Sequence, residues 1–150
     1  MPGADYNASG IAIALALVDL LYDQQLHHSV RIVFLDAQSL GFLGAYDYAQ
    51  KIQSQKNIIL GVVNLEMLGH DSKFFDKDKK YKNFKVYTRD KSKDENESDL
   101  KFLKTFVKTT DNASVNIKFE LMQNNFNNSD HFRFWDVGIP AVIFTQNWEK

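Results

Sequence analysis

The 150-residue sequence contains no cysteine, which excludes a disulfide and a thiolate metal site and fits a reducing compartment. It also lacks an excess of charge of either sign, because 18 basic and 19 acidic residues leave a net charge of −1. Without such an excess, no electrostatic field gathers nucleic acid or an anionic membrane. We therefore expect no nucleic-acid partner.

No apolar run of the sequence is long enough to cross a membrane. The most apolar stretch, Ile11 to Leu21, is interrupted by Asp19 and is far shorter than the ~20 residues that a span needs. Residues Met1 to Gly3 show neither the basic nor the apolar region of a signal peptide. By default, we expect a cytoplasmic location.

Two widespread site motifs are missing as well. Ser9 and Ser39 have no nearby histidine in a G-x-S-x-G context, so the sequence does not indicate a serine-hydrolase site. The glycines are not spaced as in a phosphate-binding loop. The common routes to serine-based hydrolysis and nucleotide binding are therefore not predicted.

The sequence does contain enough apolar material for a single domain over residues 1–150, since 44% of the residues are hydrophobic. Apolar residues at helical spacing predict helices, and short apolar or alternating runs predict strands. The predicted helices cover 9–26, 41–54, 98–109 and 131–137, and the predicted strands cover 30–35, 58–67, 84–88, 115–121 and 140–145.

This alternation of helices and strands predicts an α/β domain, a three-layer α/β/α sandwich with a mixed, mostly parallel sheet. We expect the apolar helix at 9–26 to be buried against the sheet, with Asn7 or Ser9 capping it. The charged stretch from Asp71 to Lys101 is expected to be a solvated excursion. The central strands are expected to contain Ile32, Phe34, Val62, Leu65, Val142 and Phe144.

Polar residues follow two of the predicted strands. Asp36 to Ser39 come directly after one strand, and Glu66 lies at the end of the next. Ligand sites in α/β sheets lie beyond the carboxyl ends of the strands. These residues are therefore candidates for a functional site.

Four ordered stretches carry a more specific signal: PGADYNASG at 2–10, FLDAQSLGFLG at 34–44, NLEMLG at 64–69, and Ser129-Asp130-His131 followed by GIPA at 138–141. They resemble the patterns PGADDNASG, FxxxDGEELGLLGS, NxDMIG and SDHxPFxxxGIPA of the co-catalytic zinc aminopeptidases. That family also contains glutamate carboxypeptidase and the non-enzymatic transferrin-receptor ectodomain. The resemblance implies a zinc-exopeptidase-like fold, here lacking the first strands and the last strand-loop-helix segment. Family members are often exported.

The same resemblance implies altered metal chemistry. In active members, a first-motif Asp bridges two zinc ions, the second motif supplies a Glu base and a Glu ligand, and the third supplies an Asp ligand. Two His ligands come from segments before and after the stretch found here. Matched to these motifs, Tyr6 stands at the bridging position, Gln38 at the base, Ser39 at the adjacent ligand and Glu66 at the third ligand.

The substituted residue types are poor at this chemistry. A phenol has a pKa of ~10 and is neutral at pH 7. The amide of Gln38 cannot accept a proton, and the hydroxyl of Ser39 is a weak zinc ligand compared with a carboxylate. Neutral side chains also remove the repulsion that a carboxylate cluster would suffer without cations. We therefore expect no catalytic residue, no metal ligand and no cofactor.

We interpret the chain as a degenerate aminopeptidase-like domain, a pseudoenzyme that serves as a scaffold or binds a peptide or small molecule. Two relations are expected at its site: Glu66 pairs with a backbone amide or Tyr6, and Asp130 and His131 hold each other. The expected cleft is lined by Asp5, Tyr6, Gln38, Ser39, Glu66, Ser129, Asp130 and His131.

Two alternatives stay open. In the first, the chain is a fragment of a zinc-dependent aminopeptidase in which substitute ligands rebuild one zinc site. The second concerns assembly. In the family, strands before the first motif cover one side of the sheet, and their absence here predicts a twofold homodimer that buries the vacated surface. A monomer in which the Asp71–Lys101 stretch folds back over that surface is the competing possibility.

Overall fold

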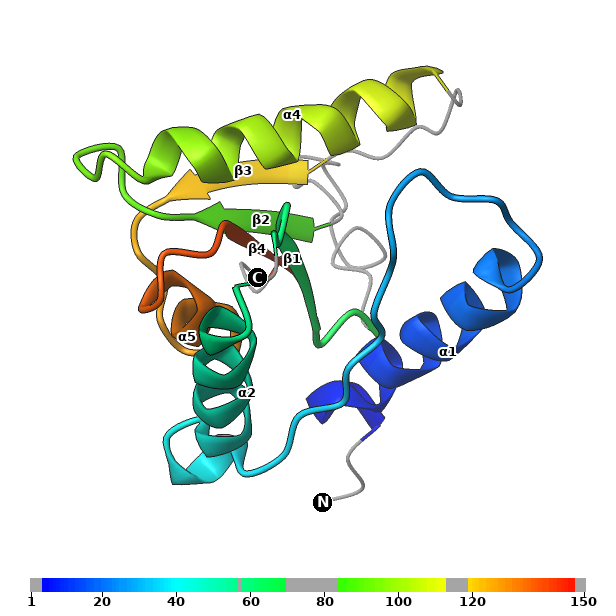
Figure 1. The fold of residues 1–150 in the computed structure, drawn as a ribbon, viewed down its shortest axis with the longest axis horizontal. Coiled ribbons are helices and arrows are strands. Elements are labelled where there is room, and N and C mark those ends of the chain that lie inside the picture. Colours follow the sequence, from blue (N-terminus) through cyan, green and yellow to red (C-terminus); the bar gives the residue numbers. More distant parts are fainter. Residues whose placement is uncertain (1–3, 57, 70–83, 113–118, 148–150) are drawn as a thin grey trace, which may run out of the picture.

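The computed structural model describes residues 4–56, 58–69, 84–112 and 119–147. Its four strands, β1 (Val62–Glu66), β2 (Phe84–Thr88), β3 (Phe119–Gln123) and β4 (Ala141–Gln146), form one open sheet in the order β1-β4-β2-β3 (Figure 1). β4 is parallel to β1 and antiparallel to β2, while β2 and β3 are parallel. The predicted mixed, mostly parallel sheet is confirmed.

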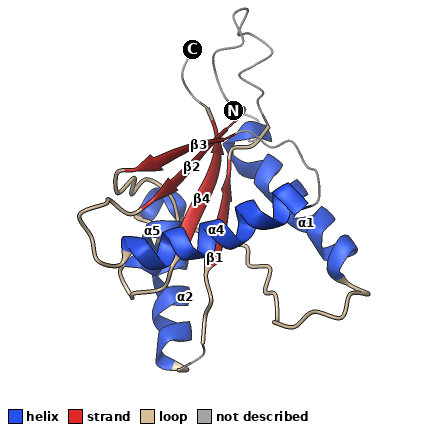
Figure 2. Cartoon of the chain, turned by 90° about the horizontal axis from the view of Figure 1, so that it is seen from above, coloured by secondary structure: helices blue, strands red, loops and turns tan. Residues whose placement is uncertain are grey.

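Helices cover both faces of this sheet. They are α1 (Ser9–Leu21), which follows a π-helical turn at Ala4–Ala8, α2 (Leu43–Ser54), which follows a 3-10 turn at Gln38–Leu40, α4 (Asn96–Asn112) and α5 (His131–Trp135). Figures 1 and 2 show α4 on one side of the sheet and α2 with α5 on the other. The predicted three-layer α/β/α architecture is therefore present.

The sheet divides two hydrophobic cores. Val142 and Phe144 of β4 pack with Val86 and Leu103 beneath α4. On the opposite face, Ala141 joins a cluster made mainly by α2 and α5. All six residues of β4 are buried, as expected for a strand covered on both faces. The prediction that Val142 and Phe144 lie in a central strand is confirmed.

The predicted strand at 30–35 is wrong. Residues 24–26 and 29–37 have no regular secondary structure, and Phe34 is exposed. A strand forms only where a neighbour supplies its hydrogen bonds, and no strand of the described residues lies beside this run. For the same reason β1 is an edge strand here, so Ile32, Phe34, Val62 and Leu65 do not occupy central strands.

The prediction that the first helix is buried is also wrong. Only Gly10 of α1 is buried. Within the described residues, no helix is both apolar enough and long enough for a membrane crossing. Six large apolar side chains of α1 are between 36% and 68% exposed: Ile11, Ile13, Leu15, Leu17, Val18 and Leu20.

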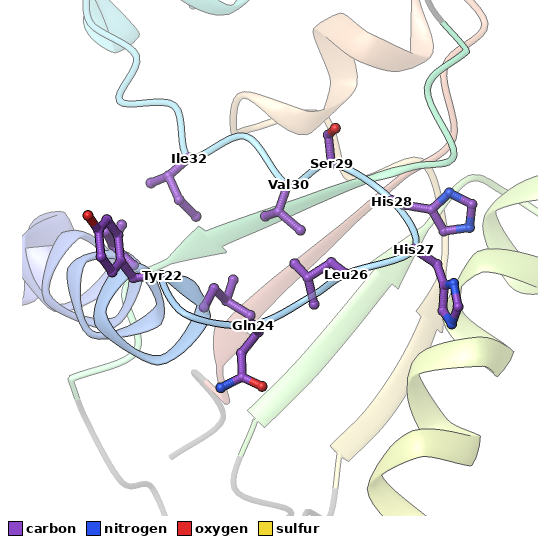
Figure 3. Close-up of a pocket in the computed structure, with 10 residues that line it drawn as sticks. Tyr22, Gln24, Leu26, His27, His28, Ser29, Val30 and Ile32 are labelled. Atoms are coloured by element: carbon purple, nitrogen blue, oxygen red, sulfur yellow. The ribbon is translucent and has the colours of Figure 1, made fainter.

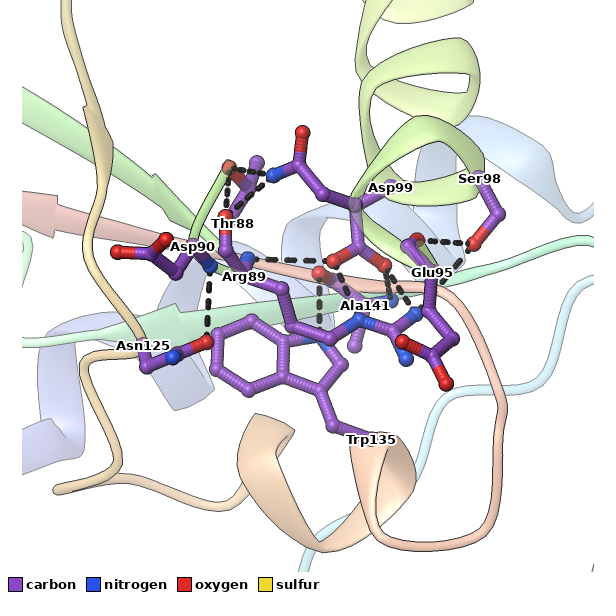
Figure 4. Close-up of polar contacts among 10 residues, drawn as sticks. Thr88, Arg89, Asp90, Glu95, Ser98, Asp99, Asn125, Trp135 and Ala141 are labelled. Atoms are coloured by element: carbon purple, nitrogen blue, oxygen red, sulfur yellow. Dashed lines mark hydrogen bonds and ion pairs between the residues drawn. The ribbon is translucent and has the colours of Figure 1, made fainter. Parts of the chain in front are cut away.

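The charged stretch expected to be solvated contains a buried ion pair instead. Residues 70–83 lie outside the described residues, but 84–101 form β2 and the start of α4. Asp99 accepts hydrogen bonds from the Arg89 side chain at 2.8 Å and from the backbone N–H of Arg89 and Ala141 (Figure 4). Trp135 lies beneath the guanidinium at 5.9 Å. The density of charged residues did not predict solvent exposure here, because the charges of Arg89 and Asp99 pair with each other and can therefore be buried.

Candidate functional site

A polar cluster lies where β1 ends. We define the Glu66 cluster as Gln38, Asn64, Glu66, Ser129 and Asp130. The Ser129 hydroxyl donates to Glu66 Oε2 at 2.7 Å and accepts from Asn64 Nδ2 at 2.6 Å. Hydrogen bonding from the Gln38 side chain also lowers the pKa of the Glu66 carboxyl group. The 3-10 turn, β1 and the loop before α5, which are far apart in the sequence, are thereby joined through side chains.

The Glu66 carboxylate is buried and has a perturbed pKa. Burial raises its pKa from the ordinary value, while the hydrogen bonds from Ser129 and Gln38 pull it down. The prediction that Glu66 pairs with a backbone amide or Tyr6 is wrong, because its partners are a hydroxyl and a side-chain amide. These two neutral donors stabilise the carboxylate without a cation.

Asp130 brings a second carboxyl group toward Glu66. Burial, with the negative charge of Glu66 as the smaller cause, raises the pKa of Asp130 to about 6. Its Oδ1 is buried and has no hydrogen-bond partner among the described residues. The cluster therefore contains two acidic groups that disfavour each other's charge.

His131 is turned away from the cluster. Its Nε2 lies 2.6 Å from the carbonyl oxygen of Phe126, and its ring stacks on Phe126 and meets Trp135 edge-on. Burial lowers the pKa of His131 to about 4, so the ring is neutral at pH 7. Because Nε2 must carry the proton to reach a carbonyl, Nδ1 is an acceptor, and it has no partner within the described residues.

The expected pairing of Asp130 with His131 is therefore wrong in the described structure. The buried Asp130 Oδ1 and His131 Nδ1 are both without hydrogen-bond partners. The imidazole is instead held by its aromatic neighbours and by the Phe126 carbonyl. Its position gives it a structural role.

The first motif is attached to the end of β1. The N–H of Met67 donates to Asn7 Oδ1 at 3.2 Å, and the N–H of Leu68 donates to Ser9 Oγ at 3.0 Å. The expected capping of α1 by these side chains is wrong, because no side chain caps that helix. The two side chains instead satisfy backbone donors of another motif.

Tyr6 and Ser39 are not members of the cluster. Tyr6 is 69% exposed, and its side chain has no hydrogen bond or ring contact within the described residues. Ser39 is exposed in the 3-10 turn, next to Gln38. Asp5 lies in the π-helical turn, and its side chain is outside the described part of the structure.

Left-handed backbone conformations flank the cluster. Ala37 has φ 55° just before Gln38, and Met67 has φ 50° just after Glu66. Non-glycine residues adopt this region at a cost of order 1 kcal/mol or more, and such strain gathers at functional sites. The geometry that aims Gln38 and Glu66 at each other is therefore maintained against local preference.

Asn64 is a site residue that sequence reasoning missed. It lies two residues before Glu66 on β1, and residues two apart on a strand point to the same face. This two-residue spacing could have identified Asn64 as a site residue, since it begins the same motif that contains Glu66. Its amide orients the Ser129 hydroxyl toward Glu66.

The sequence matches peptidase family M28 over residues 1–150. The chain belongs to peptidase family M28. Among curated proteins, no sequence matches it. The M28 assignment agrees with the four ordered motifs, because the last three supply the Glu66 cluster and the first is hydrogen-bonded to the residues that follow β1.

Solved structures of similar fold include several aminopeptidases, one of them described as a zinc enzyme. The aminopeptidase from Aneurinibacillus sp. strain AM-1 aligns with a TM-score of 0.68 and 24% identity, over 99% of this chain and 32% of that one. BSAP, a zinc aminopeptidase from Bacillus subtilis, gives 0.67 and 22%, over 97% and 32%. The LapA aminopeptidase of Legionella pneumophila gives 0.65 and 17%, over 98% and 37%. The M28 chain thus spans about a third of their lengths.

The described residues do not fit the zinc that these neighbours suggest. Nowhere in the described ranges do three or more His, Cys, Asp or Glu side chains come together as a potential metal site. Zinc needs three or four such protein ligands. The Glu66 cluster offers two carboxyl groups and is otherwise built from neutral amides and a hydroxyl.

Glu66 and Ser129 of the Glu66 cluster are buried, and its other three members are half-buried. Ser129 is fully buried, so its hydroxyl cannot act as a nucleophile toward a substrate in solution. A hollow of about 440 Å³ lies between the end of α1 and the segment up to Ile32 (Figure 3). Another, of about 320 Å³, lies between α4 and β3. Neither hollow is lined by a member of the Glu66 cluster.

Proposed function

We propose that the chain is a degenerate aminopeptidase-like domain without peptidase activity, which acts as a scaffold or as a peptide- or small-molecule-binding module. The observation that carries this proposal is that the buried Glu66 carboxylate is held by a neutral donor, the Ser129 hydroxyl at 2.7 Å. Gln38 stands where the resemblance places the general base, and hydrogen bonding from its neutral amide favours the charged form of the neighbouring Glu66. A residue that donates to a carboxylate in this way cannot take a proton from water.

Loss of activity is further supported by the fate of the other motif residues. Tyr6 and Ser39 are exposed, and Glu66 accepts a hydrogen bond from the Ser129 hydroxyl. What the fold retains is a polar, structured cluster at the carboxyl ends of strands. Such edges bind ligands in α/β domains.

The test is to measure zinc content and aminoacyl-nitroanilide turnover of the purified chain, with and without added zinc or cobalt. We expect less than stoichiometric zinc and no turnover above buffer. Stoichiometric zinc together with turnover, both lost in Glu66→Ala, would overturn the proposal. A thermal-shift screen with amino acids and short peptides distinguishes the two remaining roles, because only a binding module is stabilised by its ligand.

One observation favours the alternative of a zinc-dependent aminopeptidase. Glu66 and Asp130 are both buried enough to raise their pKa values, and a cation would relieve their repulsion. Zinc titration against a chromophoric chelator separates the possibilities. Binding that is abolished by Glu66→Gln and by Asp130→Asn favours the zinc enzyme, whereas no competition favours the degenerate domain.

A further inference from the structure

The side chain of Arg133 connects α5 to the turn that carries Gln38. Nη2 of Arg133 donates a 2.7 Å hydrogen bond to the carbonyl oxygen of Gly41, a residue 92 positions earlier in the chain. Gly41 directly follows the 3-10 turn at Gln38–Leu40. Within the described residues, no other side chain is hydrogen-bonded to the backbone of residues 37–42. The guanidinium is therefore the polar side-chain link between α5 and this turn.

The turn has a backbone conformation that needs support from outside. Ala37, Gly41 and Phe42 all have positive φ, at 55°, 81° and 61°. Non-glycine residues adopt this region at a cost of order 1 kcal/mol or more, and they remain there only where the surrounding structure holds them. The N–H groups of Gly41 and Phe42 both bond to the Gln38 carbonyl, at 3.2 Å and 3.1 Å. The bond from Arg133 adds an attachment of this closed turn to the rest of the domain.

The Arg133 guanidinium is itself held in a defined orientation. It lies 4.4 Å from the ring centroid of Phe132 and 5.5 Å from that of Tyr46, within the range of cation–π attraction. Its Nη1 donates to Asp136 at 3.2 Å. Phe132 in turn meets the ring of Phe42 edge-on, with the centroids 5.3 Å apart. The group that reaches Gly41 is thus fixed on several sides, and the same ring contacts join α5 to the end of the turn.

Arg133 occupies the position of the proline in the pattern SDHxPF, which Ser129-Asp130-His131 otherwise follows. A proline side chain contains no hydrogen-bond donor, so the bond to the Gly41 carbonyl depends on the residue that this chain has there. Gln38, at the other end of the same turn, also differs from its pattern. The two substituted positions are therefore connected through one turn.

We propose that Arg133 is a positioning residue of the candidate site, which fixes the turn so that Gln38 is directed at Glu66. Arg133 acts at a distance: it bonds to Gly41, the turn carries Gln38, and hydrogen bonding from Gln38 reaches the buried Glu66 carboxylate. A residue that only packs α5 against α2 would affect stability without changing the surroundings of Gln38. The position of the Gln38 side chain separates these two roles. Zinc content and turnover, which test the loss of peptidase activity, are independent of it.

The test compares Arg133→Met with Arg133→Lys by nuclear magnetic resonance. Methionine keeps an unbranched side chain to pack on the rings but has no donor, whereas lysine keeps a cationic donor for the Gly41 carbonyl. In Arg133→Met, we expect the Gln38 side-chain amide to lose its nuclear Overhauser contacts to Ser129 and Glu66. Its protons should exchange with solvent about fivefold to tenfold faster, as expected when one hydrogen bond is lost. In Arg133→Lys, both properties should return toward those of the parent.

Asp136→Ala is the matched control, because it removes the 3.2 Å ion pair of Arg133 and leaves the donor to Gly41 in place. Its Gln38 signals should match those of the parent. Arg133→Gln, which is shorter but polar, replaces Arg133→Met if that variant does not fold. Unchanged Gln38 contacts in the variant without the long side-chain donor would overturn the proposal. So would an equal loss in Arg133→Lys, or in Asp136→Ala.

Discussion

The hydroxyl of Ser129 donates a 2.7 Å hydrogen bond to the carboxylate of Glu66, and this bond ties the loop before α5 to the carboxyl end of β1. Ser129 is fully buried, and its second hydrogen bond, from Asn64, orients the hydroxyl proton toward Glu66. The pair therefore holds the third and fourth sequence motifs together. It also supplies to Glu66 part of the stabilisation that a cation would otherwise provide.

Removing this donor should destabilise the domain. Ser129→Ala leaves both the Glu66 carboxylate and the Asn64 amide short of a buried partner, so we expect a loss of about 1–3 kcal/mol in the free energy of unfolding. Urea denaturation measures it. Ser54→Ala is the control, because the Ser54 hydroxyl bonds only to its own helix at an exposed position, and it should change stability by less than ~0.5 kcal/mol. Equal losses in the two variants would contradict the role given to Ser129.

The raised pKa of Asp130 predicts a pH effect of defined sign. Its pKa rises from 3.8 to about 6 on folding, so between these values the folded state binds more protons than the unfolded state. Stability contributed by Asp130 is therefore present below pH 4 and is lost as the pH rises through about 6. Asp130→Asn should stabilise the domain at pH 7.5, by on the order of 1 kcal/mol after allowance for solvent screening, and leave it unchanged at pH 4.

Thermal unfolding at several pH values measures this difference. In the parent, His131 opposes the effect of Asp130 on stability. The pKa of His131 falls from 6.5 to about 4 on folding, so the stability that the neutral imidazole contributes is lost as the pH falls from 6.5 to 4. With Asp130 neutralised, the loss of stability between pH 6.5 and pH 4 should become steeper. Asp47→Asn, at an exposed position of α2, should leave the curve parallel to that of the parent. A stabilisation by Asp130→Asn that is the same at pH 4 and pH 7.5 would refute the electrostatic cause.

The buried pair of Arg89 and Asp99 should be the most sensitive polar contact of the domain. Asp99→Ala removes the acceptor for three donors of Arg89 and for the Ala141 N–H, and leaves a buried guanidinium unpaired. We expect a loss of about 3–5 kcal/mol. The control Asp136→Ala breaks an exposed ion pair with Arg133 and should cost less than ~1 kcal/mol. Chemical denaturation compares them, and similar losses would mean that burial of the first pair is not decisive.

Gly10 predicts a reversal of the usual helix preference. Alanine normally stabilises a helix by ~1 kcal/mol relative to glycine. A Cβ at Gly10, however, would lie 2.6 Å from the Leu65 carbonyl oxygen, so α1 would have to move away from β1. We expect Gly10→Ala to cost about 1–3 kcal/mol. Ala16→Gly, at an exposed position of α1, is the control and should show the effect of helix propensity alone. If Gly10→Ala stabilised the domain, the close approach of Gly10 to the Leu65 carbonyl could relax without cost.

The sequence predicted the elements whose signal is local. The bounds of β2 and β4 agree with their predictions within one residue, because their apolar runs are short and bounded. The helix predicted at 98–109 is found as α4 at Asn96–Asn112, because its apolar side chains recur at helical spacing. The run at 30–35 has the same local signal but no neighbouring strand, and pairing cannot be deduced from the run itself. Similarly, Asn7 and Ser9 have the chemistry of helix caps, yet their acceptors are used by Met67 and Leu68. Which backbone amide such a side chain reaches is decided by tertiary packing.

The Glu66 cluster was predicted only in part, because tertiary packing also decides which of the motif residues meet. Motif order identified Gln38, Glu66 and Ser129, and the structure brings these three together. It did not reveal that Tyr6 is exposed or that the His131 imidazole is held in an aromatic stack. Those outcomes depend on side-chain directions and on burial among residues distant in sequence.

The last prediction concerns carboxylates restored at the motif positions. We expect Tyr6→Asp, Gln38→Glu and Ser39→Glu, combined in one chain, to give no aminoacyl-nitroanilide turnover with zinc or cobalt. The Glu66 cluster has no available imidazole, because Nε2 of His131 is bonded to the Phe126 carbonyl within an aromatic stack. His27 and His28 line the hollow beside α1 instead.

A second readout accompanies the activity assay. Gln38→Glu alone replaces a donor to Glu66 with a like charge, so it should lower the melting temperature more at pH 8 than at pH 5, where protonation relieves the repulsion. Ser39→Glu is the matched control, because that side chain is exposed and outside the cluster. Metal-dependent turnover by the triple variant would show that the carboxylates alone rebuild the site. A pH-independent effect of Gln38→Glu would mean that the two side chains do not interact as the structure describes.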